Sequence, residues 1–177
     1  MQRGRVRSST PYFIDLFSVT CDRPRLIDWV FRVKGRRKRR GARAEGDGGP
    51  SLSPCPSPLE GEGYAHILRP TAGTVGDGAR LSWRIGPRDG LDLFLTGKSD
   101  LVVGEAPFSP ASELTDLVIA RRKARTTLFA SVISPYRGLR GFVNGVRVVT
   151  PDPGFRNAIG LVVETAAGEE PWFISLR

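Results

Sequence analysis

The stretch Ala120-Arg-Arg-Lys-Ala-Arg-Thr-Thr-Leu-Phe-Ala-Ser-Val-Ile-Ser-Pro-Tyr136 decides the fold that this sequence predicts. It has no helical period, and branched and aromatic residues fill its second half, which is typical of strands. We expect two strands, Asp116–Ala120 and Thr127–Ser134, joined by a tight basic turn. A chain built of such ribbons buries its core by stacking sheets, so the sequence predicts architecture better than chemistry.

The same strand signature begins near the start of the chain. Tyr12–Val19 is rich in aromatic and branched residues, and Ile27–Val33 alternates apolar and polar side chains. Between them, Cys21–Arg25 contains Pro24 and other residues that favour a turn. We therefore expect a β-hairpin here.

Further strands follow at a spacing of about ten residues, which favours a sandwich or a barrel. Asn144-Gly145 is a strong signal for a two-residue hairpin turn. No helical period persists, although Ala111–Leu117 has room for one or two helical turns. The sequence predicts an all-β fold, a mostly antiparallel β-sandwich. Its later strands are expected at Leu81–Ile85, Leu91–Thr96, Phe142–Val143, Val146–Val149, Ile159–Glu164 and, after a turn at Ala167-Gly168, Trp172–Leu176.

Length and charge set further bounds. With 177 residues the chain can hold one domain with a real core, and its 21 Gly and 14 Pro favour turns over long helices. The net charge is +9, but the run Lys34–Arg43 supplies seven positive charges with no acid among them, which leaves only +2 for the rest. The basic character therefore belongs to one segment.

The segment 35–63 differs in composition from the sequence around it. It joins most of the basic run to a stretch rich in Pro, Gly and Ser, and it cannot bury enough apolar surface to offset its ordering entropy. We expect a disordered insertion within the sandwich, with the first hairpin in residues 1–34 and the remaining strands in residues 64–177.

Few residues suit metal or redox chemistry. Cys21 and Cys55 are too few for a disulfide framework and are expected to be free thiols, and no zinc spacing occurs. No apolar run approaches the roughly 20 residues of a membrane span. Asp15 interrupts the one stretch that resembles an export signal, so we expect no signal peptide. Localisation in a bacterial cytoplasm or periplasm stays open.

Three pieces of the chain together resemble one family. Tyr12–Val19 with Ile27–Phe31, then Ala79–Trp83, then Ile119–Arg137 resemble strands in the C-terminal β-sheet module of heparinase II/III-like polysaccharide lyases, which include oligo-alginate lyases. The resemblance covers most of the chain except residues 35–63. It implies a β-sandwich packed against an (α/α) toroid that carries much of the catalytic apparatus. Since the sequence has no long amphipathic helices, it resembles only the part outside the toroid.

The chain departs from the family at two histidines. In the family's hairpin one histidine usually precedes the Asp-aromatic pair and another follows it, and here Arg25 and Arg32 stand at those places. We therefore expect no catalytic residue, no metal ligand and no cofactor in this chain.

The residues favoured for contact with an acidic polysaccharide lie in the stretch quoted first. Arg121, Arg122, Lys123 and Arg125 form its basic turn, and guanidinium groups match the geometry of carboxylates. Tyr136 can stand where a uronate lyase needs an acid. Each also has a structural interpretation, a solvated turn for the four basic residues and a packed corner for the tyrosine.

Other candidates have simpler structural interpretations. Asp15 and Asp28 can form a carboxylate pair or salt bridges with Arg25 or Arg32. His66, the single histidine, is expected in a solvated loop. The tryptophans can stack on sugars, but each occupies a predicted strand, where core packing is the default. They are Trp29, Trp83 and Trp172.

The resemblance implies a support or polysaccharide-contacting module that is not catalytic alone, with a toroid domain or chain as its partner. A stand-alone carbohydrate-binding module is the alternative. A nucleic-acid-binding protein is less favoured, because the run Lys34–Arg43 lacks interleaved aromatic residues and a recognisable binding fold. The polysaccharide and its linkage stay open.

Overall fold

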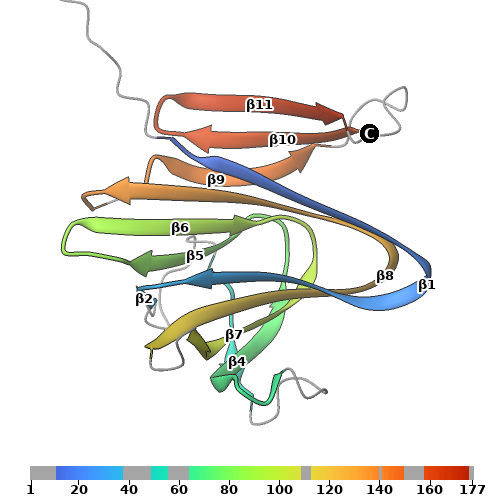
Figure 1. The fold of residues 1–177 in the computed structure, drawn as a ribbon. Coiled ribbons are helices and arrows are strands. Elements are labelled where there is room, and N and C mark those ends of the chain that lie inside the picture. Colours follow the sequence, from blue (N-terminus) through green and yellow to red (C-terminus); the bar gives the residue numbers. More distant parts are fainter. Residues whose placement is uncertain are drawn as a thin grey trace, which may run out of the picture.

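The computed structural model describes residues 11–37, 49–55, 64–108, 113–139, 141–149 and 158–175. Within these ranges the strands pair antiparallel in two sheets, so the predicted all-β fold is confirmed (Figure 1). The strands are β1 (Phe13–Val33), β2 (Arg36–Arg37), β3 (Ser53–Pro54), β4 (Leu68–Val75), β5 (Ala79–Arg84), β6 (Asp89–Leu95), β7 (Ser99–Phe108), β8 (Glu113–Arg137), β9 (Val143–Val149), β10 (Ala158–Thr165) and β11 (Gly168–Ser175).

The larger sheet curls around two long strands. Its order is β2-β5-β6-β8-β7-β4-β3, and β1 pairs with β8 outside this path. The first part of β8 pairs with β7 and its last part with β6, while β1 follows β8 along most of its length. Figure 1 shows β1 and β8 bending together as they pass from the level of β6 to that of β7. This bend folds one sheet into a half-barrel.

Two main apolar clusters hold the fold together. The first fills the inside of the half-barrel, where the side chains of Trp83, Leu93 and Leu101 are fully buried. The second lies between the outer face of the larger sheet, at Phe94 of β6, and the small sheet β11-β10-β9, at Leu161 of β10. Because both faces of β6 are covered, this strand is buried at every position after Asp89, as expected for a central strand.

The predicted hairpin at the start of the chain is wrong. Phe13–Val33 forms the single strand β1, which pairs with β8. The expected turn is a bulge, because the four residues Cys21–Pro24 lie opposite Arg125 alone. Proline has no N–H to donate, and it is tolerated at bulges and in edge strands. Turn residues in this sequence thus mark a bend within a strand.

The predicted basic turn in the opening stretch is also wrong. Residues 121–125 continue β8 without interruption. They include neither Gly nor Pro, so no residue in them favours a turn conformation over an extended one. The helical turns expected in Ala111–Leu117 do not form in the described part of that range, which is the start of β8 from Glu113 onward.

The Asn144-Gly145 turn is a third correction. Both residues lie inside β9, where Val143 pairs with Thr165 and Gly145 with Glu164, so Asn144 is the extra residue of a bulge. The hairpin expected around Ala167-Gly168 does form, between β10 and β11. Gly168 has a φ of 132°, which only glycine adopts readily.

The predicted insertion at residues 35–63 is described only in part. Arg36–Arg37 forms β2 beside β5, and Ser53–Pro54 forms β3 beside β4. Residues 38–48 and 56–63 lie outside the described residues, so their disorder stays a prediction.

Candidate functional site

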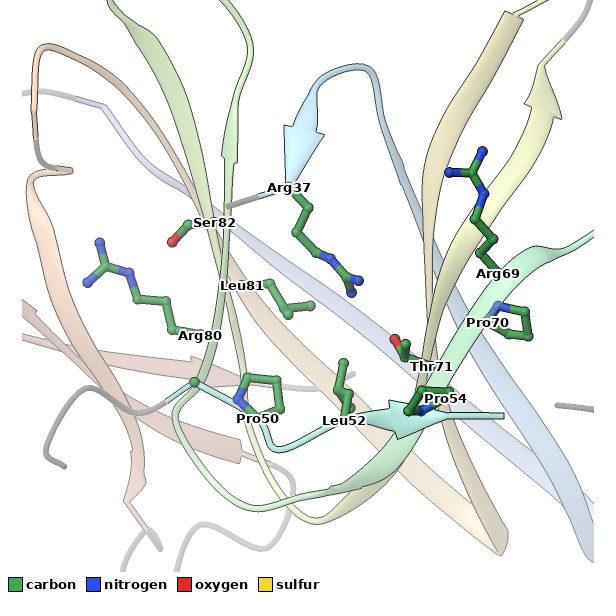
Figure 2. A pocket seen from close by; sticks show the side chains of 11 residues that line it. Arg37, Pro50, Leu52, Pro54, Arg69, Pro70, Thr71, Arg80, Leu81 and Ser82 are labelled. Carbon is green, nitrogen blue, oxygen red and sulfur yellow. The ribbon is translucent and has the colours of Figure 1, made fainter. Parts of the chain in front are cut away.

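A groove opens between β4 and β5. The two strands follow each other around the turn at residues 76–78, yet β4 pairs with β7 and β5 pairs with β6, so they diverge. The space between them has a volume of about 570 Å³ and is also bordered by β2 and by residues 49–54 (Figure 2). The curl of the larger sheet thus brings its two edges to the same groove.

The groove combines positive charge with an apolar floor. Figure 2 shows Arg37 of β2 and Leu81 of β5 pointing into it, with Leu52 beside them. Arg69 stands on the β4 wall. Guanidinium groups bind carboxylates, and leucine side chains suit an apolar ligand face. This arrangement suits a ligand that carries carboxylates on a partly apolar body.

Arg80 borders the groove, but its contacts stabilise the sheet. Its side chain points away from the groove (Figure 2), and its Nη2 atom lies 2.7 Å from Oδ2 of Asp92. Asp92 is fully buried and also accepts a hydrogen bond of 2.6 Å from the Ser82 hydroxyl. A buried carboxylate without its cation would be costly, so Arg80 serves the stability of the sheet.

Asp116 lies inside the half-barrel beside β2. Its Oδ2 atom accepts a hydrogen bond of 2.6 Å from Nε1 of Trp83, and its carboxylate also accepts the backbone N–H of Arg37. Burial is the main reason that the pKa of Asp116 lies above its ordinary value, and the nearby charge of Glu105 adds to this. The two donors and the charge of Arg37 act in the opposite direction. Asp116 thus contacts the backbone of a residue that lines the groove.

The structure gives Arg121 a fixed partner. Its Nε and Nη2 atoms each lie 2.7 Å from a carboxylate oxygen of Asp28, and the Tyr64 hydroxyl donates to the same carboxylate. Burial would raise the pKa of Asp28, but the hydrogen bonds from Arg121 and Tyr64 outweigh it and lower that pKa. Arg121 therefore fastens the segment that precedes β4 to the outside of the half-barrel.

Arg122 points to the inside of the bend. Its guanidinium donates to the backbone carbonyls of Thr96 at 2.6 Å and Leu128 at 2.8 Å and to the Ser99 hydroxyl at 2.8 Å. It also lies over the ring of Phe129, 4.5 Å from its centre. These contacts saturate the guanidinium with protein acceptors.

The remaining predicted site residues lie apart from one another. Lys123 and Arg125 are exposed at the bend of β8. Tyr136 is buried near the end of β8, with its ring over Gly90 of the neighbouring β6. The structure does not bring Arg121, Arg122, Lys123, Arg125 and Tyr136 to one place, and none lines the groove. A role for Lys123 and Arg125 in binding stays a prediction.

The other predicted candidates have structural partners. Asp15 accepts a hydrogen bond of 2.9 Å from Nε1 of Trp29, while Asp28 pairs with Arg121. Arg25 instead lies 3.8 Å from Asp22, and Arg32 donates to the backbone carbonyl of Pro107. Trp29 and Trp83 are buried and Trp172 is partly exposed, while His66 is exposed.

The two groove arginines escaped the sequence analysis for different reasons. Arg37 belongs to the basic run, most of which falls in the predicted insertion. Arg69 is an isolated arginine before Pro70 and carries no pattern at all. Both arginines line the same groove only because the sheet curls, and no local sequence pattern specifies that curl.

The described residues were also compared with the requirements of a metal site and of a membrane-spanning helix. Among them no three His, Cys, Asp or Glu side chains gather as a metal site requires, and no helix is long and apolar enough to cross a bilayer. Cys21 and Cys55 are free thiols, as expected.

Two comparisons with known proteins give no match. No protein-family model matches the chain, and no curated protein matches it. The resemblance to heparinase II/III-like lyases therefore stays a prediction from the sequence.

Proposed function

We propose that this chain is a non-catalytic module that binds an acidic polysaccharide in the groove between β4 and β5. The observation that carries the proposal is the pair Arg37 and Arg69, which line the groove from different walls, with Leu52 and Leu81 beside Arg37. A uronic acid residue offers a carboxylate for a guanidinium and an apolar ring face for the leucines. The groove matches both parts of such a sugar.

The same proposal includes a partner. In a heparinase II/III-like enzyme, which the sequence resembles, a β-sheet module lies against an (α/α) toroid. Our chain would there hold the polymer while the toroid carries out β-elimination. A matching experiment is the ultraviolet assay for unsaturated uronate with and without an added toroid chain. Activity only in the presence of the toroid supports this role, whereas binding without activity in both cases favours a stand-alone carbohydrate-binding module.

The groove itself is tested by two charge-matched double variants. Arg37→Gln/Arg69→Gln removes two positive charges from the groove, and Lys123→Gln/Arg125→Gln removes two from the bend of β8. Charge-assisted hydrogen bonds contribute roughly 1.5–3 kcal/mol each where water is largely excluded, and exposed ion pairs such as those of Arg69 about 0.2–1 kcal/mol. We therefore expect the groove variant to weaken alginate binding by about tenfold or more in isothermal titration calorimetry. The bend variant should stay within about twofold of the wild type.

Several results would contradict the groove. An equal loss in both variants means general attraction of polyanions, and a loss confined to the bend variant moves the site to the basic part of β8. Titration with heparin and with DNA over a salt series separates the classes of polymer. Preference for DNA with a steep salt dependence would support nucleic-acid binding instead.

A further inference from the structure

Arg69 has an unusual backbone in the wall of the groove. It lies at a bulge in β4, because Leu68 pairs with Glu105 of β7 and the next pair joins Thr71 to Val103. Its φ is 49°, and among the described residues it is the one residue other than glycine with a positive φ. Such a conformation costs free energy and is retained where the surrounding structure enforces it. Bulges re-aim side chains in this way, often beside binding sites.

The re-aimed side chain meets a carboxylate. Nη2 of Arg69 lies 3.1 Å from Oε2 of Glu105. The Arg69 side chain is 72% exposed and that of Glu105 is 32% exposed. Ion pairs in contact with water contribute little net stability, because each group gives up hydration and freedom to form them. A second carboxylate from solution can therefore exchange with Glu105 at little cost.

Glu105 lies close to a second negative charge. It is directly opposite Asp116 on the neighbouring strand β8, and like charges at such positions destabilise a sheet. Asp116 is held by Trp83 and by the backbone of Arg37, so it cannot easily turn away. The charged groups around Glu105 are thus Arg69 on one side and Asp116 on the other. An acidic ligand in the groove would add a third negative charge.

We propose that Glu105 is a competitor of the ligand for Arg69. Its carboxylate pairs with Arg69 in the free protein, and the carboxylate of an acidic ligand replaces it. The inference rests on the proposed function and explains what limits the affinity of the groove for an acidic ligand. One carboxylate replaces another on the same guanidinium, and the released Glu105 turns to water. A ligand carboxylate has to displace Glu105 from Arg69, so the pair lowers the affinity of the groove for acidic polymers, and a polymer without carboxylates gains nothing at this position.

The experiment compares two variants that remove the same charge. Glu105→Gln removes the competitor, and Glu113→Gln removes a glutamate whose partner, Lys34 at 2.9 Å, is not among the residues that line the groove. Binding of a defined alginate oligosaccharide is measured by calorimetry, with a dextran oligosaccharide of equal length as the uncharged control. We expect Glu105→Gln to tighten alginate binding by about three- to tenfold and Glu113→Gln to change it less than twofold. In the Arg69→Gln background the gain from Glu105→Gln should vanish.

The outcomes separate this inference from the proposed function. If the wild type binds alginate and Glu105→Gln does not tighten the binding, competition by Glu105 is refuted, while ligand binding in the groove remains supported. Equal gains in the two glutamate variants also refute it, since they reflect overall charge. If neither the wild type nor Glu105→Gln binds alginate, the proposed function and the competitor both fail. Thermal melting of each variant verifies that the glutamine forms are folded.

Discussion

The side chain of Arg122 is held by the bend of the larger sheet. Strand β6 ends at Leu95 and β7 begins at Ser99, so at the bend one edge of β8 lacks a neighbouring strand. Arg122 fills that gap by donating to the carbonyls of Thr96 and Leu128. Burial lowers the pKa of Arg122, which is the cost of placing a guanidinium there. In sequence Arg122 resembles Lys123, yet alternation along the strand gives them opposite surroundings.

Replacement of Arg122 should therefore destabilise the fold. We expect Arg122→Met to lower the free energy of unfolding by about 2–4 kcal/mol, because at least two backbone carbonyls lose charged donors. Urea denaturation followed by tryptophan fluorescence measures the change. The control is Lys123→Met, an exposed neighbour, for which we expect a change within about 0.5 kcal/mol. Equal effects of the two variants would mean that Arg122 is no more structural than its neighbour.

Single residues also show what could be predicted about the site. For Tyr136 the sequence allows a catalytic acid or a packed corner, and the buried ring over Gly90 fits the packed corner. The arginines of the groove were not foreseen, because Arg37 and Arg69 meet only after β4 and β5 diverge. Their positions follow from pairing partners far along the chain, and a local pattern does not contain that information.

For the strands as well, local sequence patterns predict some features, whereas others depend on pairing with distant segments of the chain. Alternation identified most strand segments, since burial on one face leaves a period of two in the sequence. It did not show that Tyr12–Val19 and Ile27–Val33 form one strand, because a bulge and a turn use the same residues. Only the pairing of both segments with the same strand β8, on either side of the bulge, distinguishes the two cases.

The pair Gly90 and Tyr136 tests how β6 and β8 fit together. The two residues are direct neighbours across the strands, and a Cβ atom on Gly90 would overlap the tyrosine ring. We expect Gly90→Ala to lower the melting temperature through a loss of about 1–3 kcal/mol. Gly76→Ala is the control, since its Cβ would meet open space and should leave the stability nearly unchanged. A Gly90→Ala protein as stable as the wild type would show that the ring can move without cost.

The whole molecule consists of a half-barrel with a small sheet on its back. The small sheet has one face on the second apolar cluster, where Leu161 and Val163 are almost completely buried. Its attachment to β1 is reinforced by Tyr12, whose hydroxyl donates to Glu170 and accepts from Nε1 of Trp172. Burial and Glu170 raise the pKa of Tyr12 to about 12, so the hydroxyl stays protonated at neutral pH. These contacts unite the two sheets.

Loss of packing between the sheets should therefore affect the entire protein. We expect Leu161→Ala to lower the free energy of unfolding by about 2–5 kcal/mol, since it leaves a cavity between the sheets. Phe173→Ala on the neighbouring strand removes a side chain that is 73% exposed and should cost less than about 1 kcal/mol. Calorimetry measures both changes. A separate, early transition in Leu161→Ala would mean that the small sheet unfolds independently.

The pairing of β1 with β8 has a consequence for biosynthesis. Val33 pairs with Asp116 and Phe13 with Ile133, so β1 leaves the ribosome long before its partner has been translated. Contacts between such distant positions slow folding, and an unpaired apolar strand is exposed to aggregation in the meantime. The β1 segment of the nascent chain therefore stays open to aggregation until β8 has been translated.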